Sequence, residues 1–169
     1  MTQPQNITLA LDGETATRQL AFLLAESLPL DVTVALIGPL GAGKTRFVQA
    51  YAEALGVPPE SVTSPTFVLC QPYTGQRGGR SVAIQHLDWY RIADEEELLA
   101  LGIEELFESE GVKLVEWADR FMHLLPPRRV ELHFGVTGAA TRTVRLEIQW
   151  DAPAGLLPSI AARMRRSVP

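Results

Sequence analysis

The spacing of apolar positions along the chain predicts strands and helices in alternation. Residues 12–28 and residues 44–55 carry apolar side chains at three- and four-residue steps, which places these side chains along one side of a helix. Residues 32–37 (VTVALI) are apolar throughout and rich in β-branched side chains, as is typical of a strand that is covered on both faces. The first part of the chain therefore predicts a helix, a buried strand, a glycine-rich loop and a second helix.

The remaining segments continue this alternation. A polar, proline-bearing connection at residues 61–67 leads into a strand through Tyr73. A glycine-rich turn at residues 74–80 then leads into a strand at residues 81–88, and we expect these two strands to pair as a hairpin. The other expected elements are a short helix after Asp94, a second helical piece through Phe107, strands at residues 112–117, 130–136 and 143–149, and helices at residues 118–125 and 155–166.

This order predicts an α/β sandwich with a mixed, mostly parallel central sheet and an inserted β-hairpin. The chain has 169 residues and is 46% hydrophobic, which suffices for one domain with a substantial core and leaves little for a second. We therefore expect a single domain over residues 1–169, with its core near residues 7–150 and a C-terminal helix and tail at residues 151–169.

The composition narrows the functional classes. A formal net charge of -5 argues against binding nucleic acid without a partner, because such affinity comes mainly from lysine and arginine neutralising phosphates. Cys70 is the only cysteine, so no intramolecular disulfide and no thiolate cluster can form, which suits a reducing compartment. The N-terminus lacks a basic start followed by an apolar core, and no apolar run approaches the roughly 18 residues that span a bilayer. We expect a soluble cytoplasmic protein with no membrane partner.

The stretch GPLGAGKT matches the phosphate-binding loop pattern G-x-x-x-x-G-K-[ST], and it lies between the strand and the helix that this motif requires. Its glycines let backbone N–H groups converge on a phosphate at the helix N-terminus, where the peptide dipoles favour negative charge. The lysine then binds the β- and γ-phosphates, and the threonine hydroxyl ligates Mg²⁺. A P-loop NTPase is predicted, with nucleotide contacts at Gly38, Pro39, Leu40, Gly41, Ala42, Gly43, Lys44 and Thr45.

A phosphoryl-transfer site also needs a carboxylate for Mg²⁺ and a polar group that positions the nucleophile. Asp88 and Glu116 each end a short apolar stretch, so both belong at the carboxyl edge of the sheet, beside the glycine loop. The residues alone leave open which carboxylate touches the metal directly. An ordinary solvated carboxylate remains the alternative for each.

Three further polar residues are candidates for the same site. Ser64 and Thr66 lie on the loop after the predicted phosphate-binding helix, where other nucleotide switches keep a segment that responds to the γ-phosphate. His86 lies two residues before Asp88 and therefore on the same face of the strand. The alternatives are hydroxyls of an ordinary turn and a structural histidine. The other two histidines have no ligand-like spacing.

Two absent motifs and the distribution of charge narrow the function further. No N-K-x-D guanine-reading motif is present, so we expect ATP as the nucleotide, and no arginine-rich lid of a nucleotide kinase is visible. Arg46, Arg91 and Arg120 are scattered candidates for charge stabilisation, with a surface position as the alternative. Residues 94–110 contain eight carboxylates and no lysine or arginine, which is typical of a solvated helix face but also suits docking on a basic protein.

Five motifs, GPLGAGKTRF, TSPTFVL, HLDWYR, LGIEELF and VEWADR, occur in the order and spacing of the bacterial TsaE (YjeE) family, which the chain resembles over residues 12–136. The resemblance implies a small P-loop ATPase required for making threonylcarbamoyladenosine in tRNAs that read codons beginning with A. It implies the TsaD and TsaB proteins as partners, with tRNA contacted only indirectly through that complex.

By the same resemblance, Lys44 and Thr45 match the family's phosphate and Mg²⁺ contacts, Glu116 matches its metal-side carboxylate, and Asp88 matches the acid needed for hydrolysis. The resemblance therefore implies Lys44, Asp88 and Glu116 as catalytic residues, and Thr45 and Glu116 as metal ligands. Residues 61–67 match a switch-like loop, so Ser64 and Thr66 are expected near the nucleotide.

The chain departs from the family pattern at Pro39, Trp89 and Ala118, and none of these changes removes a phosphate or metal ligand. The family's adenine contacts are less motif-like, and we expect them around residues 12–17 and Thr141. Two other functions stay open on the residues alone. A small-molecule or nucleotide kinase would bind an acceptor hydroxyl through Asp88 and Tyr90, and a nucleotide-gated adaptor would bind ATP without needing to cleave it.

Overall fold

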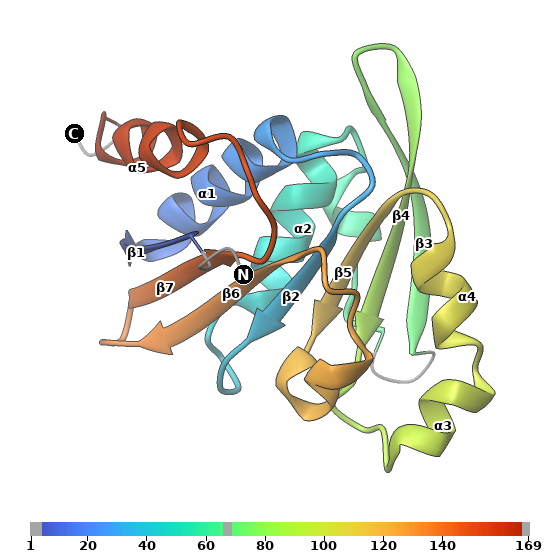
Figure 1. The fold of residues 1–169 in the computed structure, drawn as a ribbon. Helices are drawn as coiled ribbons and strands as arrows, with labels where there is room; N and C mark the ends of the chain where they lie inside the picture. Colours follow the sequence, from blue (N-terminus) through green and yellow to red (C-terminus); the bar gives the residue numbers. More distant parts are fainter. Residues whose placement is uncertain (1–4, 66–68, 167–169) are drawn as a thin grey trace.

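The computed structural model, described here for residues 5–65 and 69–166, contains one seven-stranded sheet in the order β1-β7-β6-β2-β5-β4-β3 (Figure 1). The four central strands, β6, β2, β5 and β4, run parallel, whereas the pairs β1–β7, β7–β6 and β4–β3 are antiparallel. The predicted mixed sheet with a parallel centre and an added hairpin is confirmed. The strands are β1 (Gln5–Asp12), β2 (Thr33–Ile37), β3 (Cys70–Arg77), β4 (Arg80–Asp88), β5 (Val112–Glu116), β6 (Arg129–Val136) and β7 (Thr141–Ile148).

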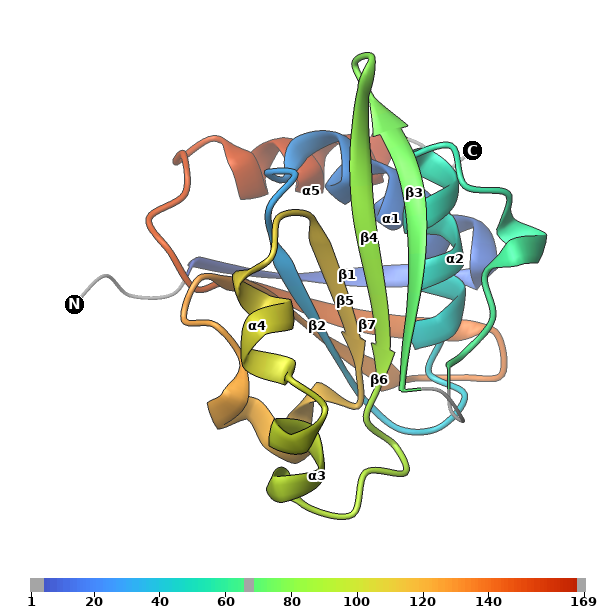
Figure 2. The same ribbon diagram turned by 90° about the vertical axis from the view of Figure 1, so that its right-hand side faces the viewer.

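Helices cover the two faces of the sheet unequally, as Figures 1 and 2 show. One face packs against α1 (Gly13–Ser27), α2 (Lys44–Ala54) and α5 (Leu156–Arg166), and the main apolar core lies between them. On the other face, α3 (Glu95–Ala100), α4 (Ile103–Glu108) and the 3₁₀ segment η2 (Ala118–Leu124) pack against β2, β5 and β4 through a smaller core. A further 3₁₀ turn, η1 (Pro59–Ser61), follows α2. Within the described ranges, no helix has the length and apolar character that crossing a membrane requires.

The topology gathers three strand ends at one edge of the sheet. The glycine loop leaves the end of β2, whose Leu36 is the register partner of Glu116 at the end of β5. Glu116 is in turn the register partner of Asp88 at the end of β4. Because the carboxyl ends of parallel strands share an edge, both carboxylates lie beside the loop, as their positions in the sequence predict.

Three local predictions need correction. Strand β1 lies outside the predicted elements, although Ile7, Leu9 and Leu11 alternate with polar or small residues in the period of a strand with one buried face. The turn expected at residues 74–80 is shorter, because Gly78 and Gly79 alone form it. Both have positive φ, 58° and 76°, which is the backbone that a tight two-residue hairpin turn requires, so β3 and β4 extend further than predicted.

The helix expected at residues 118–125 is the 3₁₀ segment η2 with a break at Phe121. Phe121 has φ -142° and ψ 49°, and its ring packs edge-on against buried Trp89 at a centroid distance of 6.0 Å. The segment is also short, because it follows Trp117, whose backbone has the left-handed conformation, and ends just before Pro126. A short segment under these tertiary constraints does not reach regular α-helical geometry.

Candidate active site

The glycine loop joins β2 to α2 through a backbone that only glycine adopts easily. Gly38, Gly41 and Gly43 have φ values of 145°, 75° and 102°. A Cβ atom on Gly38 would lie 2.6 Å from the backbone oxygen of Phe134, so this position excludes any side chain. The remaining predicted loop contacts, Pro39, Leu40 and Ala42, follow the same turn around the N-terminus of α2.

Lys44 begins α2 and folds its ammonium back over the loop. Its side chain is nearly buried, and Nζ donates to the carbonyl oxygens of Gly38 at 2.6 Å and Pro39 at 2.9 Å. Nζ also lies 3.8 Å from the centroid of the Trp117 ring, a cation–π contact that the sequence motifs do not reveal. Burial lowers the pKa of Lys44, and the nearby negative charge of Glu116 opposes that shift.

Glu116 links the glycine loop to the strands. The hydroxyl of Thr45 donates to Glu116 Oε2 at 2.9 Å, although 71 positions separate the two residues. The other oxygen, Oε1, lies 2.8 Å from Nε2 of His86. Glu116 is 2% exposed and His86 is 0% exposed, so this network lies inside the protein.

Asp88 is held by a different set of donors. The hydroxyl of Ser64 donates to Oδ2 at 2.6 Å, and the backbone N–H of Tyr90 donates to Oδ1 at 2.9 Å. Ser64 is thus brought to the site from the loop after α2, as predicted. Thr66, predicted on the same loop, lies outside the described residues.

These residues surround one open cavity of about 430 Å³. The rings of Tyr90 and Trp117 pack together on its wall, with centroids 4.8 Å apart. The cavity is lined by Leu40, Gly41, Ala42, Gly43, Lys44, Thr45, Arg46, Ser64, Asp88, Tyr90, Glu116 and Trp117. All predicted loop residues except Gly38 and Pro39 therefore line it, and those two accept the hydrogen bonds of Lys44 instead.

A second cavity of about 280 Å³ adjoins the other side of the glycine loop. Arg142 spans its rim and donates to the backbone oxygen of Gly41 at 3.1 Å, a contact that no sequence motif signals. Adenine contacts were expected around residues 12–17 and Thr141, and part of that range lines this cavity. Thr141 does not line it and is instead the strand partner of Asp12. The lining residues are Gly13, Glu14, Thr17, Gly41, Ala42, Gly43, Arg46, Ala139, Ala140 and Arg142.

Other candidates have structural partners. Arg120 donates to the backbone oxygens of Trp89 and Tyr90 and so holds the segment after β4 in place. Trp89 is fully buried in the smaller core. Cys70 donates to Gln85 at 3.2 Å, and burial raises the pKa of its thiol. Of these residues only Arg120 was a predicted candidate, and its contacts support the backbone beside the site.

The acidic segment 94–110 is partly committed to local contacts. Asp94 caps α3 by accepting the backbone N–H of Glu97 at 3.0 Å, and the Glu97 carboxylate accepts the N–H of Ala93 at 2.8 Å. Glu95 lies 2.8 Å from Nε2 of exposed His123. At these positions the carboxylates act as helix-capping and surface groups.

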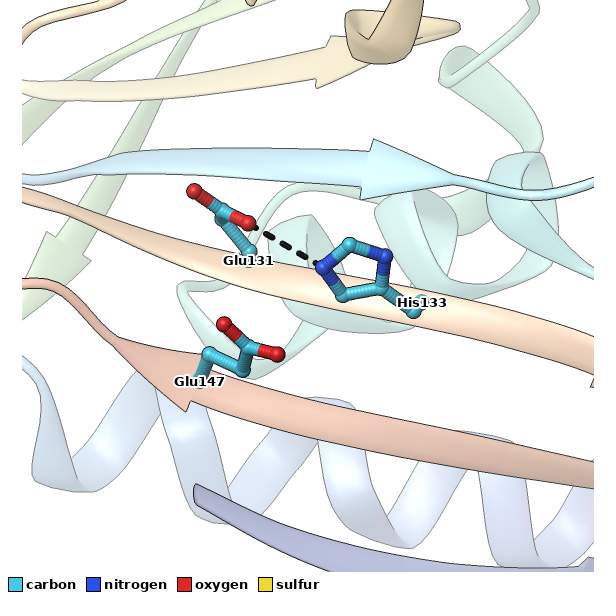
Figure 3. A group of neighbouring side chains, drawn as sticks. All are labelled: Glu131, His133 and Glu147. Atoms are coloured by element: carbon cyan, nitrogen blue, oxygen red, sulfur yellow. Dashed lines mark hydrogen bonds and ion pairs between the residues drawn. The ribbon is translucent and has the colours of Figure 1, made fainter. Parts of the chain in front are cut away.

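A separate polar group, Glu131, His133 and Glu147, lies on β6 and β7 and does not line the 430 Å³ cavity (Figure 3). One potential ligand atom from each lies within 4.8 Å of the other two. Arg129 contacts Glu131 at 2.7 Å, and Arg145 contacts Glu147 at 2.5 Å. Because arginine already neutralises both carboxylates, this group is explained as an ion network and needs no metal.

Comparisons with known proteins point to one family. A family model described as Threonylcarbamoyl adenosine biosynthesis protein TsaE matches residues 11–144. A Rickettsia felis protein named tRNA threonylcarbamoyladenosine biosynthesis protein TsaE is 38% identical over 128 residues, which cover 76% of this chain and 72% of that protein. The Bacillus subtilis protein of the same name is 38% identical over 116 residues, 69% of each chain. A crystal structure of Bacillus subtilis YdiB matches with a TM-score of 0.73 and 26% identity over 96% of this chain and 98% of that one.

Proposed function

The chain belongs to the TsaE family, and from this premise we propose that it is a Mg²⁺-dependent ATPase that supports threonylcarbamoyladenosine synthesis in tRNA. The reaction assigned to the chain is attack of water on the γ-phosphorus of ATP, which breaks the bond to the bridging oxygen and releases ADP and phosphate. The transfer of the threonylcarbamoyl group itself is assigned to the TsaD and TsaB partners.

The bond between Thr45 and Glu116 carries this proposal. A P-loop threonine that donates its proton to a carboxylate keeps the lone pairs of its oxygen for a metal ion. The geometry fits this use, because the bond lies at the cavity wall and both residues line the cavity. When bound, Mg²⁺ supplies positive charge to the phosphate oxygens as the phosphorus–oxygen bond breaks. Thr45 and Glu116 would hold it.

Lys44 and the loop would bind the phosphates. Gly38 lets the start of the loop pack closely against the backbone of Phe134, and the positive φ angles of Gly41 and Gly43 turn the chain into the N-terminus of α2, where backbone N–H groups would contact phosphate oxygens. Lys44 now donates to two loop carbonyls, and its ammonium would exchange these partners for phosphate oxygens. The smaller cavity beside Gly41 would take the nucleoside end of ATP, with Arg142 at its rim.

Asp88 would orient the attacking water. Its carboxylate lies in register with Glu116 and lines the same cavity, and the Ser64 hydroxyl fixes one of its oxygens. Since Ser64 belongs to the loop after α2, this bond connects a loop that would respond to the γ-phosphate with the carboxylate that acts on water. Docking of TsaD and TsaB would fix the conformation of this loop and raise the slow intrinsic rate of ATP hydrolysis.

The direct test combines the purified protein with TsaD, TsaB, tRNA and the remaining substrates, and follows phosphate release and threonylcarbamoyladenosine in the same tubes. We expect the partners to raise hydrolysis and sustained modification to require this protein. Modification that proceeds equally well without it would contradict the proposal. Stoichiometric phosphate transfer to an added nucleoside would favour a kinase, and full modification with a variant that binds but cannot cleave ATP would favour an adaptor.

A further inference from the structure

His86 reaches the active site from inside the protein. Its side chain is 0% exposed, and it shares one face of β4 with Asp88. Its register partner on β5 is Leu114, two residues before Glu116, so the imidazole meets the glutamate carboxylate diagonally across two parallel strands. The ring contacts Glu116 and is not among the residues that line the 430 Å³ cavity.

The two oxygens of Glu116 each have one side-chain partner. His86 Nε2 lies 2.8 Å from Oε1, and Thr45 Oγ1 lies 2.9 Å from Oε2. The terminal torsion of a glutamate has a broad energy profile, so a single contact leaves the carboxylate free to rotate, whereas partners on both oxygens fix its plane. We propose that His86 is a positioning residue, which holds Glu116 so that the oxygen next to Thr45 is presented to Mg²⁺. This inference rests on the proposed function.

The unused ring nitrogen of His86 argues against a role in core packing alone. A carboxylate accepts hydrogen bonds, so Nε2 carries the proton that bonds to Glu116, and Nδ1 has no hydrogen-bond partner among the described residues. A buried polar atom without a partner destabilises the fold, and an apolar side chain would avoid that loss. The bond to Glu116 is what a histidine provides here and an apolar residue cannot.

Two amide variants isolate this bond. The amide nitrogen of His86→Gln lies as far along the side chain as Nε2, whereas that of His86→Asn falls one bond short. The probe is AMP-PNP, a non-hydrolysable ATP analogue, titrated by calorimetry with Mg²⁺ and with EDTA. We expect Mg²⁺ to tighten binding to the wild type, His86→Asn to reduce that tightening about tenfold or more, and His86→Gln to stay within about threefold of the wild type. Affinity in EDTA should not change.

Ile84→Ala is the matched control, because Ile84 is equally buried on the same face of β4, two residues earlier. It should lower the Tm and leave the Mg²⁺ effect on AMP-PNP binding intact. If His86→Asn behaved like Ile84→Ala, the positioning role would be wrong and His86 would be a packing residue. If the wild type itself bound AMP-PNP equally with Mg²⁺ and EDTA, the proposed function would fail, and this inference with it.

Discussion

The sheet holds two pairs of buried carboxylates in register on neighbouring strands, and their surroundings differ. Asp88 lies opposite Glu116 on β4 and β5, and Glu131 lies opposite Glu147 on β6 and β7. Around Glu131 and Glu147, arginine side chains provide the compensating charge. Around Glu116, the partners are a hydroxyl and an imidazole, and among the described residues no lysine or arginine forms an ion pair with it.

The difference distinguishes a structural ion network from the site to which we assign a cation. Two neighbouring carboxylates repel each other and lose hydration when buried, so each pair needs compensation. The β6–β7 pair obtains this compensation from Arg129 and Arg145. The β4–β5 pair faces a cavity, beside a lysine whose ammonium is bonded to backbone carbonyls. Glu116, which forms no ion pair with lysine or arginine among the described residues, is therefore the carboxylate to which we assign Mg²⁺.

Substitution of the two lysines of the chain should give the largest difference in ATP hydrolysis. Lys44→Met should lower ATP hydrolysis about 10²- to 10³-fold, because it removes the charge that stabilises the transferring phosphate. Lys113 is also buried but contacts Asp31 and the backbone oxygen of Ser109, so Lys113→Met should lower the Tm and leave hydrolysis near the wild-type rate. Phosphate release measures the hydrolysis rate of both variants, and thermal unfolding measures the Tm. A Lys44→Met protein with wild-type turnover would contradict the assigned site.

The next largest effect on hydrolysis is expected for Asp88→Asn. The amide keeps the shape of the side chain but has no negative charge and cannot accept a proton from the attacking water, so hydrolysis should fall about 10²-fold while AMP-PNP binding stays within a few-fold. Ser64→Ala removes one hydrogen-bond donor to Asp88 and should lower the hydrolysis rate by about tenfold or less. Single-turnover hydrolysis and AMP-PNP titration separate the two effects. Equal loss of binding and hydrolysis in Asp88→Asn would assign Asp88 to nucleotide binding instead.

The arginines of the β6–β7 network should have the smallest effects, and only on stability. Arg129 is 19% exposed and donates to both Glu131 and the backbone oxygen of Pro126, so Arg129→Ala should lower the unfolding free energy by about 1–3 kcal/mol. Arg145 is 52% exposed, and its loss should cost about 1 kcal/mol or less. Urea denaturation measures both. A change in hydrolysis in either variant would show that the network is coupled to the active site.

The glycine loop was predictable because its chemistry is local. Gly38, Lys44 and Thr45 lie within eight consecutive residues, and a buried strand and a helix flank them. Asp88 and Glu116 were predictable for a related reason, since each ends a strand and the strand ends of a parallel sheet share an edge. Position in an element therefore located both carboxylates without any knowledge of register.

Contacts across strands were not predictable in the same way. The bond between His86 and Glu116 depends on the register of β4 against β5, and the group of Glu131, His133 and Glu147 depends on that of β6 against β7. A shift of one residue would turn these side chains to the other face. Glu131 and His133 share a face of β6 by their spacing of two residues, whereas Glu147 joins them only through the register of β6 against β7, which the sequence does not reveal.

We expect Glu116, and not the carboxylates of the β6–β7 network, to hold the metal. Matched variants, Glu116→Gln and Glu147→Gln, test it when hydrolysis of ATP is measured against Mg²⁺ concentration. Glu116→Gln should lower hydrolysis about 10²-fold and require more Mg²⁺, and Glu147→Gln should keep the wild-type Mg²⁺ dependence with a lower Tm. Wild-type Mg²⁺ dependence in Glu116→Gln, or loss of that dependence in Glu147→Gln, would show that Glu116 is not the residue that holds Mg²⁺.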